Sequence, residues 1–427
     1  MRCVMPFAHV LTTCVLLTAA ASAAASAAAT HGALSPSGTV GVWEPLTIAQ
    51  LNGGDANAVG DYIQSIMADP VNPGTFYLAA GNNDGRSIKW LRSTDFGDSW
   101  ELRNATAMNG NPWGFSIDPN PNRNPATLPT LYSPAGYGSV GAWKSTDGAA
   151  TWTRLAGADA AFGPYNPYGP TLTDLYHVQV LPDDPPNHLL ATYHYGFKNN
   201  ADGGFGESWD GGATWVIHEP AAGIGTSHYV IPISGTTWCV IAQSNNGDSG
   251  IWRTATAGRV GGTAAQKFRD GTISTAAWSK VSDVEHVHGS FQAWRTGAGA
   301  WYAPGWTTIA KSTDDGATWV PLVSGNWPGT FNGVNTSGIV ATSRFVYGNS
   351  FVETTLSRAR LDDDTNWDRA YSPPTVANGA NPYGTTVTYA AATGNYVILM
   401  GDHDHGIVWR YIEPSGADGI FADGFGG

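Results

Sequence analysis

The sequence predicts an all-β fold, a seven-bladed β-propeller whose blades are four-stranded antiparallel sheets. Three observations predict it: a phrase that recurs along the chain, seven short segments that each open with Trp, and a composition rich in Gly and aromatic residues. The 427 residues include 54 Gly and 18 Trp, and only 13% are charged. Such a composition favours strands and turns over helices, and internal repeats are typical of architectures built from one repeated unit.

The repeated phrase is Ser-x-Asp-x-Gly-x-Thr-Trp. It occurs without a mismatch at 208–215 and 312–319, and in looser form at 93–100 and 145–152, where Ala149 stands in the glycine place. Short Ser and Asp side chains can bind the backbone amides of a tight turn, and Gly tolerates the positive φ that such a turn needs. We therefore expect a turn at each copy, with the Trp opening the next strand. The turn carboxylates, which we expect to be structural, are Asp95, Asp147, Asp210 and Asp314.

Short strands that open with Trp mark the outer edge of each blade. They follow the four phrases and recur where the phrase itself has decayed, at Trp43, Trp100, Trp152, Trp215, Trp278, Trp319 and Trp367. Between them lie runs suited to innermost strands, at 62–66, 113–117, 177–181, 228–231, 288–291, 333–335 and 385–389. These runs recur after roughly 40 to 65 residues, which is the size of a four-stranded blade.

The last blade is incomplete at the C-terminal end of the chain. Residues 396–412 supply only its second and third strands, whereas the strand at Trp43 is left over at the start. If that strand completes the blade, the ring closes and no sheet edge stays exposed. We therefore expect a propeller at 38–413 and a C-terminal tail at 414–427.

The phrase resembles the Asp box, or BNR repeat, of the sialidase-like β-propellers. The resemblance implies that the boxes lie between the third and fourth strands of a blade, on the face opposite the substrate site. It covers nearly the whole chain but specifies the fold more than the function. True sialidases carry a Phe/Tyr-Arg-Ile-Pro phrase near the first blade, which this sequence lacks. Among these propellers the chain looks more like the seven-bladed polysaccharide lyases.

The first 29 residues contain an early Arg, an apolar run and small residues suited to cleavage. This order is typical of a secretory signal peptide, so we expect a secreted protein, extracellular or periplasmic. Cys3 and Cys14 would leave with this segment. The remaining Cys239 can form no internal disulfide, and we expect it in a buried strand.

The formal net charge is −13, from 21 Lys and Arg against 34 Asp and Glu, and it becomes −14 without Arg2. An acidic chain is poorly suited to bind nucleic acid or an anionic membrane surface. The expected partner is a polysaccharide or oligosaccharide, and we expect a monomer.

Histidines concentrate on the face opposite the boxes. Seven of the ten that lie outside the signal segment enter innermost strands or fall between second and third strands: His177, His194, His228, His286, His288, His403 and His405. Together with Tyr, they suit proton transfer next to a carboxylate. We therefore expect a lyase that cleaves a uronic-acid-containing glycan by β-elimination. The expected base is His177, His194 or His228, the acid Tyr195 or Tyr229, and the group that neutralises the carboxylate Arg86 or Lys198.

Two histidine pairs, His286 with His288 and His403 with His405, have i, i+2 spacing. If the chain is extended there, both rings of a pair point the same way. A divalent metal, calcium or zinc, is then a possible cofactor, with oxygen ligands from Glu285, Asp402 or Asp404.

Two alternatives to a lyase remain open. A glycoside hydrolase would use two carboxylates across the scissile bond, chosen from Asp61, Asp174, Glu285, Asp402 and Asp404. A non-catalytic propeller would bind glycan or protein, with sugar rings stacked on Trp113, Trp294, Trp301 and Trp306.

Overall fold

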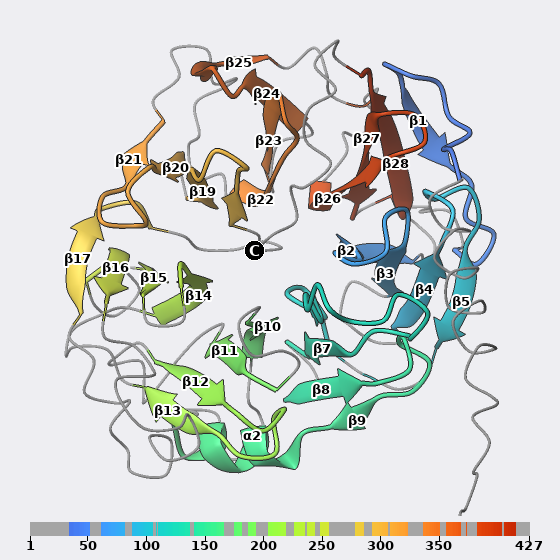
Figure 1. The fold of residues 1–427 in the computed structure, drawn as a ribbon. Helices are drawn as coiled ribbons and strands as arrows, with labels where there is room; N and C mark the ends of the chain where they lie inside the picture. The colour runs from blue at the N-terminus through green and yellow to red at the C-terminus, as the bar shows by residue number, and fades with distance from the viewer. Residues whose placement is uncertain are drawn as a thin grey trace, which may run out of the picture.

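The computed structural model describes residues 34–51, 61–81, 88–105, 108, 110–136, 141–165, 175–181, 187–193, 204–218, 226–234, 237–243, 248–255, 278–285, 293–305, 308–322, 336–350, 356–368, 373, 382–403 and 405–415. The expected signal peptide and most of the expected C-terminal tail lie outside these residues. Within them, seven four-stranded antiparallel sheets stand in a ring (Figure 1), which confirms the predicted propeller. The described residues contain no helix long and apolar enough to cross a membrane.

Each of the first three blades is built from four consecutive strands, which follow one another from the innermost to the outermost. Blade 1 contains β2 (Tyr62–Ala68), β3 (Phe76–Gly81), β4 (Lys89–Ser93) and β5 (Glu101–Asn104). Blade 2 contains β6 (Ser116–Ile117), β7 (Leu131–Pro134), β8 (Ala142–Ser145) and β9 (Thr153–Arg154). Blade 3 contains β10 (Leu175–Val180), β11 (Leu189–Tyr193), β12 (Phe205–Ser208) and β13 (Val216–His218).

The next three blades repeat the same order. Blade 4 contains β14 (Thr226–Pro232), β15 (Trp238–Gln243), β16 (Gly250–Thr254) and β17 (Ser279–Ser282). Blade 5 contains β18 (Trp294–Arg295), β19 (Trp301–Pro304), β20 (Ile309–Ser312) and β21 (Val320–Pro321). Blade 6 contains β22 (Thr336–Ala341), β23 (Phe345–Ser350), β24 (Leu356–Arg360) and β25 (Asp363–Asp368).

Blade 7 combines the two ends of the chain, as the sequence predicts. Its strands are β26 (Pro382–Ala390), β27 (Asn395–Asp402), β28 (Ile407–Glu413) and, on the outside, β1 (Trp43–Leu46). Trp43 is opposite Tyr411 in the antiparallel pair of β1 with β28, and their rings lie 5.2 Å apart. Apolar side chains from neighbouring blades form the core between the sheets, so each blade depends on its neighbours.

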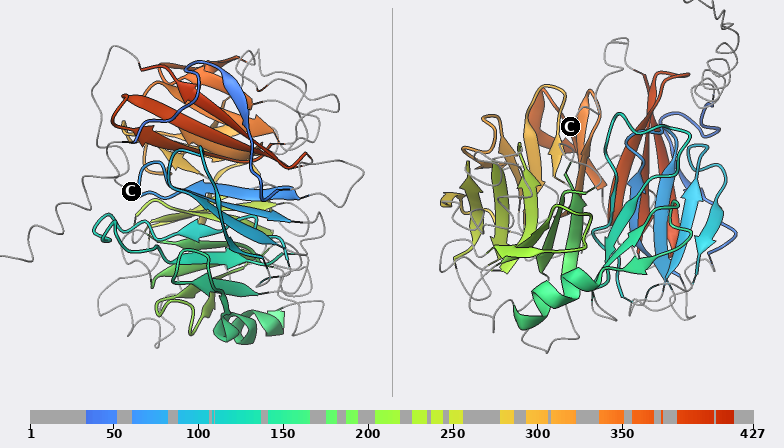
Figure 2. Two further views of the ribbon diagram at one scale, coloured as in Figure 1. Left: turned by 90° about the vertical axis from the view of Figure 1, so that its right-hand side faces the viewer. Right: turned by 60° about the horizontal axis from the view of Figure 1, so that its bottom comes forward.

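Some predicted boundaries differ from the structure. The innermost strands of blades 5 and 6 begin at Trp294 and Thr336, whereas the runs predicted for them, 288–291 and 333–335, lie outside the described residues. The sequence also did not predict helix α2 (Ala156–Phe162), which is followed by a short 3-10 helix, η1 (Gly163–Tyr165). Figure 2 shows α2 at the rim of the ring. The helix packs closely on Ala213 of blade 3, and Gly157 permits this contact, because a Cβ there would lie 2.0 Å from the Ala213 carbonyl oxygen.

The four Ser-x-Asp phrases form matching turns between the third and fourth strands of blades 1, 2, 3 and 5, here called the Ser-Asp turns. In blade 5, the Ser312 hydroxyl donates to Asp314 and accepts from the Gly316 amide, while Asp314 accepts from the Thr318 amide and hydroxyl. The hydrogen bond from the Thr318 hydroxyl holds the pKa of Asp314 below its usual range. The same contacts recur at Asp95, Asp147 and Asp210.

Each Ser-Asp turn places two successive residues in the left-handed region of backbone space. In the two looser copies these are Phe96 with Gly97 and Gly148 with Ala149, whose φ values lie between 60° and 90°. A non-Gly residue there is sterically unfavourable, and the turn's hydrogen bonds hold it in place. The turns end third strands, so they define one face of the ring, here called the turn face. First strands begin on the opposite face, here called the top face.

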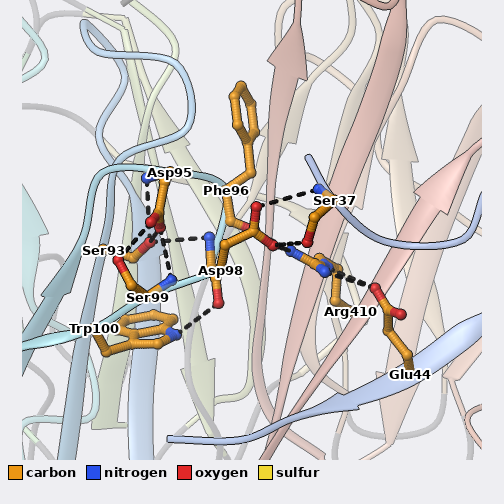
Figure 3. Close-up of polar contacts among 10 residues, drawn as sticks. Ser37, Glu44, Ser93, Asp95, Phe96, Asp98, Ser99, Trp100 and Arg410 are labelled. Atoms are coloured by element: carbon orange, nitrogen blue, oxygen red, sulfur yellow. Dashed lines mark hydrogen bonds and ion pairs between the residues drawn. The ribbon is translucent and has the colours of Figure 1, made fainter. Parts of the chain in front are cut away.

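The ring closes around a buried arginine on β28 (Figure 3). Arg410 donates to Glu44 of β1 at 2.8 Å, to the Phe96 carbonyl at 3.1 Å and to Asp98 at 2.5 Å. Ser37 also donates to Asp98 from its hydroxyl and its amide. Burial alone would raise the pKa of Asp98, but the hydrogen bonds from Ser37 and Arg410 lower it. This closure clamp joins the N-terminal segment, blade 7 and the first Ser-Asp turn.

Candidate functional site

In the described part of the top face, two predicted carboxylates lie on the two sides of the junction of blades 1 and 7. Asp61 lies directly before β2, and Asp402 ends β27. The junction is held by the Ile63 amide, which donates to the His403 carbonyl at 3.3 Å. The rings of Tyr62 and His403 are 5.1 Å apart. The entry to β2 and the turn after β27 therefore form one site, here called the blade 1–7 site.

Asp61 is buried and ion-paired. Its carboxylate lies 2.7 Å from the ammonium of Lys89, which also donates to the Gln50 carbonyl at 3.0 Å. Only 7% of the Asp61 side chain is exposed, against 24% for Lys89. The lysine supplies a counter-charge for a carboxylate that is costly to bury alone.

Asp402 is fully buried and shapes the turn that follows it. Its backbone carbonyl accepts from the Gly406 amide at 3.1 Å, and its carboxylate accepts from the His405 amide. The Nδ1 atom of His405 lies 3.0 Å and 3.1 Å from the two carboxylate oxygens. Because 13% of the His405 side chain is exposed, the histidine is the outward member of this pair.

The extended geometry assumed for His403 and His405 is wrong. Both residues lie in the turn between β27 and β28, and the rings have different surroundings: His403 packs on Tyr62, and His405 contacts Asp402. The described residues include no group of three His, Cys, Asp or Glu side chains arranged to hold a metal ion. His286, His288 and Asp404 lie outside those residues, so the calcium or zinc site stays a prediction.

A second group of predicted residues lies in the central channel rather than at the top surface. The rings of His177 and Tyr229, on neighbouring innermost strands, are 5.1 Å apart. Burial lowers the pKa of His177 to about 3 and raises the pKa of Tyr229 to about 12. Gly114 makes room for this histidine, since a Cβ there would lie 2.2 Å from its ring. Both rings line a cavity of about 220 Å³.

The predicted aromatic residues occupy three different environments. Trp113 is buried and donates to the Gln64 side chain at 3.0 Å. Trp301 is a core residue opposite Ser312, at the turn-face end of β19, so its predicted place on the top face is wrong. Its ring belongs to the apolar core between the sheets of blades 4 and 5. Trp294 is half-buried and lines the channel cavity.

Several predicted site residues lie outside the described residues: Arg86, Asp174, His194, Tyr195, Lys198 and Trp306. His228 is described only through the backbone of β14, as its side chain is outside the described set. Glu285 is half-buried and lies in the segment that leads into blade 5. Cys239 is buried in β15, as predicted.

Among the buried polar clusters that sequence reasoning missed is one in blade 3 that contains two histidines. Glu207 lies 2.6 Å from His188 Nε2 and 2.8 Å from His218 Nε2. A sequence signal for it exists: Glu207 stands directly before the Ser of its phrase, where the other three copies have Arg92, Lys144 and Lys311. The cluster lies beside the Ser-Asp turn of blade 3, at the end of β12 that is far from the top face. We therefore assign it a structural role in that blade.

Comparisons with known proteins point to carbohydrate-active enzymes, although no family model matches the chain. A xyloglucanase of Paenibacillus sp is 29% identical over 259 residues, which are 57% of this chain and 23% of that protein. The xyloglucanase Xgh74A of Acetivibrio thermocellus is 27% identical over 242 residues, 49% of this chain and 27% of that protein. The chain thus spans about a quarter of the length of the curated relatives it matches.

Solved structures agree on the fold. A streptogramin B lyase has a TM-score of 0.55 at 10% identity, covering 87% of this chain and 97% of that one. PorZ, a component of the type-IX secretion system of Porphyromonas gingivalis, has a TM-score of 0.51 at 14% identity, covering 83% of this chain and 47% of that one. At such low identity these structures show the β-propeller alone. The chain is therefore a seven-bladed β-propeller whose sequence similarity is to glycan-cleaving enzymes.

Proposed function

We propose that this protein is a glycoside hydrolase of the β-propeller class, exported by its N-terminal segment, that cleaves a xyloglucan-type polysaccharide. The similarity to xyloglucanases supports the substrate class. The four Ser-Asp turns support a place among the Asp-box propellers. The observation that carries the reaction class is the pair of buried carboxylates, Asp61 and Asp402, at one junction of the top face.

Hydrolysis of a glycosidic bond needs a proton donor to the leaving oxygen and a carboxylate that activates water or attacks the sugar. Asp61 suits the second role, because the Lys89 ammonium, 2.7 Å away, holds its carboxylate in place at the entry to β2. The Asp402 and His405 pair suits the first role, because its members lie within hydrogen-bond distance and can hold a proton between them. The outward position of His405 makes it the member that approaches the substrate.

The lyase interpretation has less support. General acid–base catalysis is most effective when the pKa of the catalytic group lies near the working pH. With a pKa of about 3, His177 is a weak base, and with a pKa of about 12, Tyr229 is a weak acid. The relatives matched by sequence are xyloglucanases, which cleave by hydrolysis.

The test is the release of reducing ends from xyloglucan by the purified protein, with a uronate polysaccharide assayed in parallel. We expect cleavage of xyloglucan and no unsaturated product from the uronate. Asp61→Asn and Asp402→Asn should each lower kcat by about 100-fold or more, because each removes one acid–base group while keeping the side-chain shape. Asp362→Asn, at an exposed pair on blade 6, is the matched control and should leave kcat unchanged.

Two results would overturn the proposal. Unsaturated products from the uronate polysaccharide would favour the lyase interpretation over hydrolysis. Binding of xyloglucan without cleavage, unaffected by both blade 1–7 variants, would favour the non-catalytic propeller. Circular dichroism of each variant separates a loss of activity from a loss of fold.

A further inference from the structure

The segment that follows β1, residues 47–51, lies at the junction of blades 7 and 1. Its side chains Ile48 and Leu51 are buried in the apolar core that these two blades share. The Leu51 amide donates to the Ile48 carbonyl at 3.0 Å, so the two apolar side chains anchor one tight turn. Gln50 is half-buried in that turn. The strand that closes the ring is therefore followed by a fixed turn at the same junction as the blade 1–7 site.

Lys89 contacts Asp61 from a strand that is two positions away in the sheet of blade 1. It begins β4, where it lies opposite Ala80 of β3, and Ala80 lies opposite Ile63 of β2. Neighbouring strands are about 4.8 Å apart, so the lysine side chain extends across β3 to reach the entry to β2. Its stem is flexible, and 24% of the side chain is exposed. A second contact for the ammonium is needed to fix its position.

Gln50 supplies this second contact and is held by a third. The Lys89 ammonium donates to the Gln50 backbone carbonyl at 3.0 Å and to the Asp61 carboxylate at 2.7 Å. The Gln50 side-chain amide donates to the Trp100 carbonyl at 2.7 Å. Trp100 directly precedes β5, and its indole donates to the Gly97 carbonyl of the first Ser-Asp turn at 3.1 Å. A continuous series of hydrogen bonds therefore connects Trp100, Gln50, Lys89 and Asp61.

We propose that Gln50 is a positioning residue of the blade 1–7 site, which holds Lys89 and through Lys89 sets the orientation of the Asp61 carboxylate. The inference rests on the proposed function, in which Asp61 activates water or attacks the sugar. A carboxylate in that role must be held close to its productive geometry, and supporting contacts of this kind hold it there. The N-terminal segment then has two tasks: β1 closes the ring, and residues 47–51 support the site.

The experiment is a double-mutant cycle on xyloglucan cleavage with Gln50→Met and Lys89→Met. Gln50→Met keeps the side-chain length and removes the hydrogen bond to the Trp100 carbonyl. We expect it to lower kcat by about tenfold, and Lys89→Met by about 30-fold, because small displacements of a catalytic group cause losses of this order. KM should stay unchanged in both. Lys89→Arg keeps the positive charge and should recover part of the loss.

The double variant tests whether Gln50 acts through Lys89. If it does, adding Gln50→Met to Lys89→Met should lower kcat no further. Losses that multiply in the double variant, or an unchanged kcat in Gln50→Met while the wild type cleaves xyloglucan, would overturn the inference and leave hydrolysis standing. If Gln50→Met does not fold, Gln50→Asn retracts the amide by one methylene and should change kcat in the same direction.

Two controls separate positioning from stability. Thr47→Val changes an exposed residue of the same segment and should leave kcat unchanged. Ser312→Ala removes hydrogen bonds on the turn face, and it should lower stability without changing kcat.

Hydrogen exchange reads the same contacts without relying on cleavage. If the wild type does not cleave xyloglucan, the proposed function fails, and the positioning of Asp61 is still measured by deuterium uptake in the peptide that contains β2. Gln50→Met should speed exchange of the Ile63 amide, which donates to the His403 carbonyl beside Asp61, whereas Thr47→Val should not. Equal exchange in the wild type and Gln50→Met would overturn the positioning itself.

Discussion

The two faces of the propeller are built from different kinds of contact. On the turn face, each Ser-Asp turn is satisfied within eight residues, and four copies use the same atoms. At the blade 1–7 site, contacts join residues far apart in the chain, such as Ile63 with His403, and no other blade repeats them in the described structure. The repeated turns serve the fold, as does the single closure clamp, whereas the single-copy contacts of the blade 1–7 site involve carboxylate and imidazole groups that can act in acid–base chemistry.

This comparison assigns stability to the turn face and, under the proposed function, activity to the top face. The variants below test that division on the turn-face side. The carboxylate variants of the blade 1–7 site test it on the other, with the largest expected change in rate.

Loss of the closure clamp should have the largest effect on stability. Arg410→Met removes a buried guanidinium and leaves Glu44 and Asp98 without their shared partner. We expect a loss of about 3 kcal/mol in the free energy of unfolding, as for other broken buried ion pairs. Urea denaturation followed by tryptophan fluorescence measures it.

Arg360→Met is the control for the clamp, because its pair with Asp362 is about two-thirds exposed. Exposed pairs contribute little, so the free energy of unfolding of this variant should stay close to that of the wild type. Equal losses in the two variants would show that the clamp does not hold the ring closed.

Removal of one turn hydroxyl should have a smaller effect. Ser312→Ala deletes the donor to Asp314 and the acceptor of the Gly316 amide. We expect a loss of about 1–2 kcal/mol, with kcat on xyloglucan unchanged. A fall in kcat without a fall in stability would place chemistry on the turn face and break the comparison.

The smallest effect should appear as a pH dependence. The folded-state pKa of Asp314 is lowered, chiefly by the Thr318 hydroxyl. Its contribution to stability is therefore complete above the unfolded pKa of about 3.9 and is lost as pH falls through the lower folded value. Asp314→Asn should flatten the fall in unfolding free energy below about pH 4, while the thermal midpoint at pH 7 drops slightly. An identical pH slope in wild type and variant would contradict this.

The sequence could predict what is encoded locally. The phrase at 312–319 contains every donor and acceptor of its turn, so reading the residues was enough to predict the hydrogen bonds. Closure by the strand at Trp43 was also predictable. The last blade lacks its outermost strand, and the N-terminal strand belongs to no other blade, so pairing the two completes the ring.

Burial and contacts between blades were not predictable in the same way. The same reasoning placed His177 and Trp301 on the top face, but one lies in the channel wall and the other in the core near a Ser-Asp turn. The alternation of side chains along a strand predicts which face of the sheet a residue lies on. It does not predict how far that residue lies from the top face along the axis of the ring. The turn at 402–406 depends on the carboxylate of Asp402, which the i, i+2 spacing of the histidines could not indicate.

The position of β1 outside β28 also sets an order of events for folding. Glu44 and Arg410 are 366 residues apart, so the first strand of the propeller to leave the ribosome waits for the last before its sheet exists. Contacts of such long sequence separation slow folding, because the entropy of closing the loop is lost before the contact forms. Blade 7 is thus expected to be completed last, and until then the apolar faces of blades 1 and 6 that pack on it are open to association with other chains.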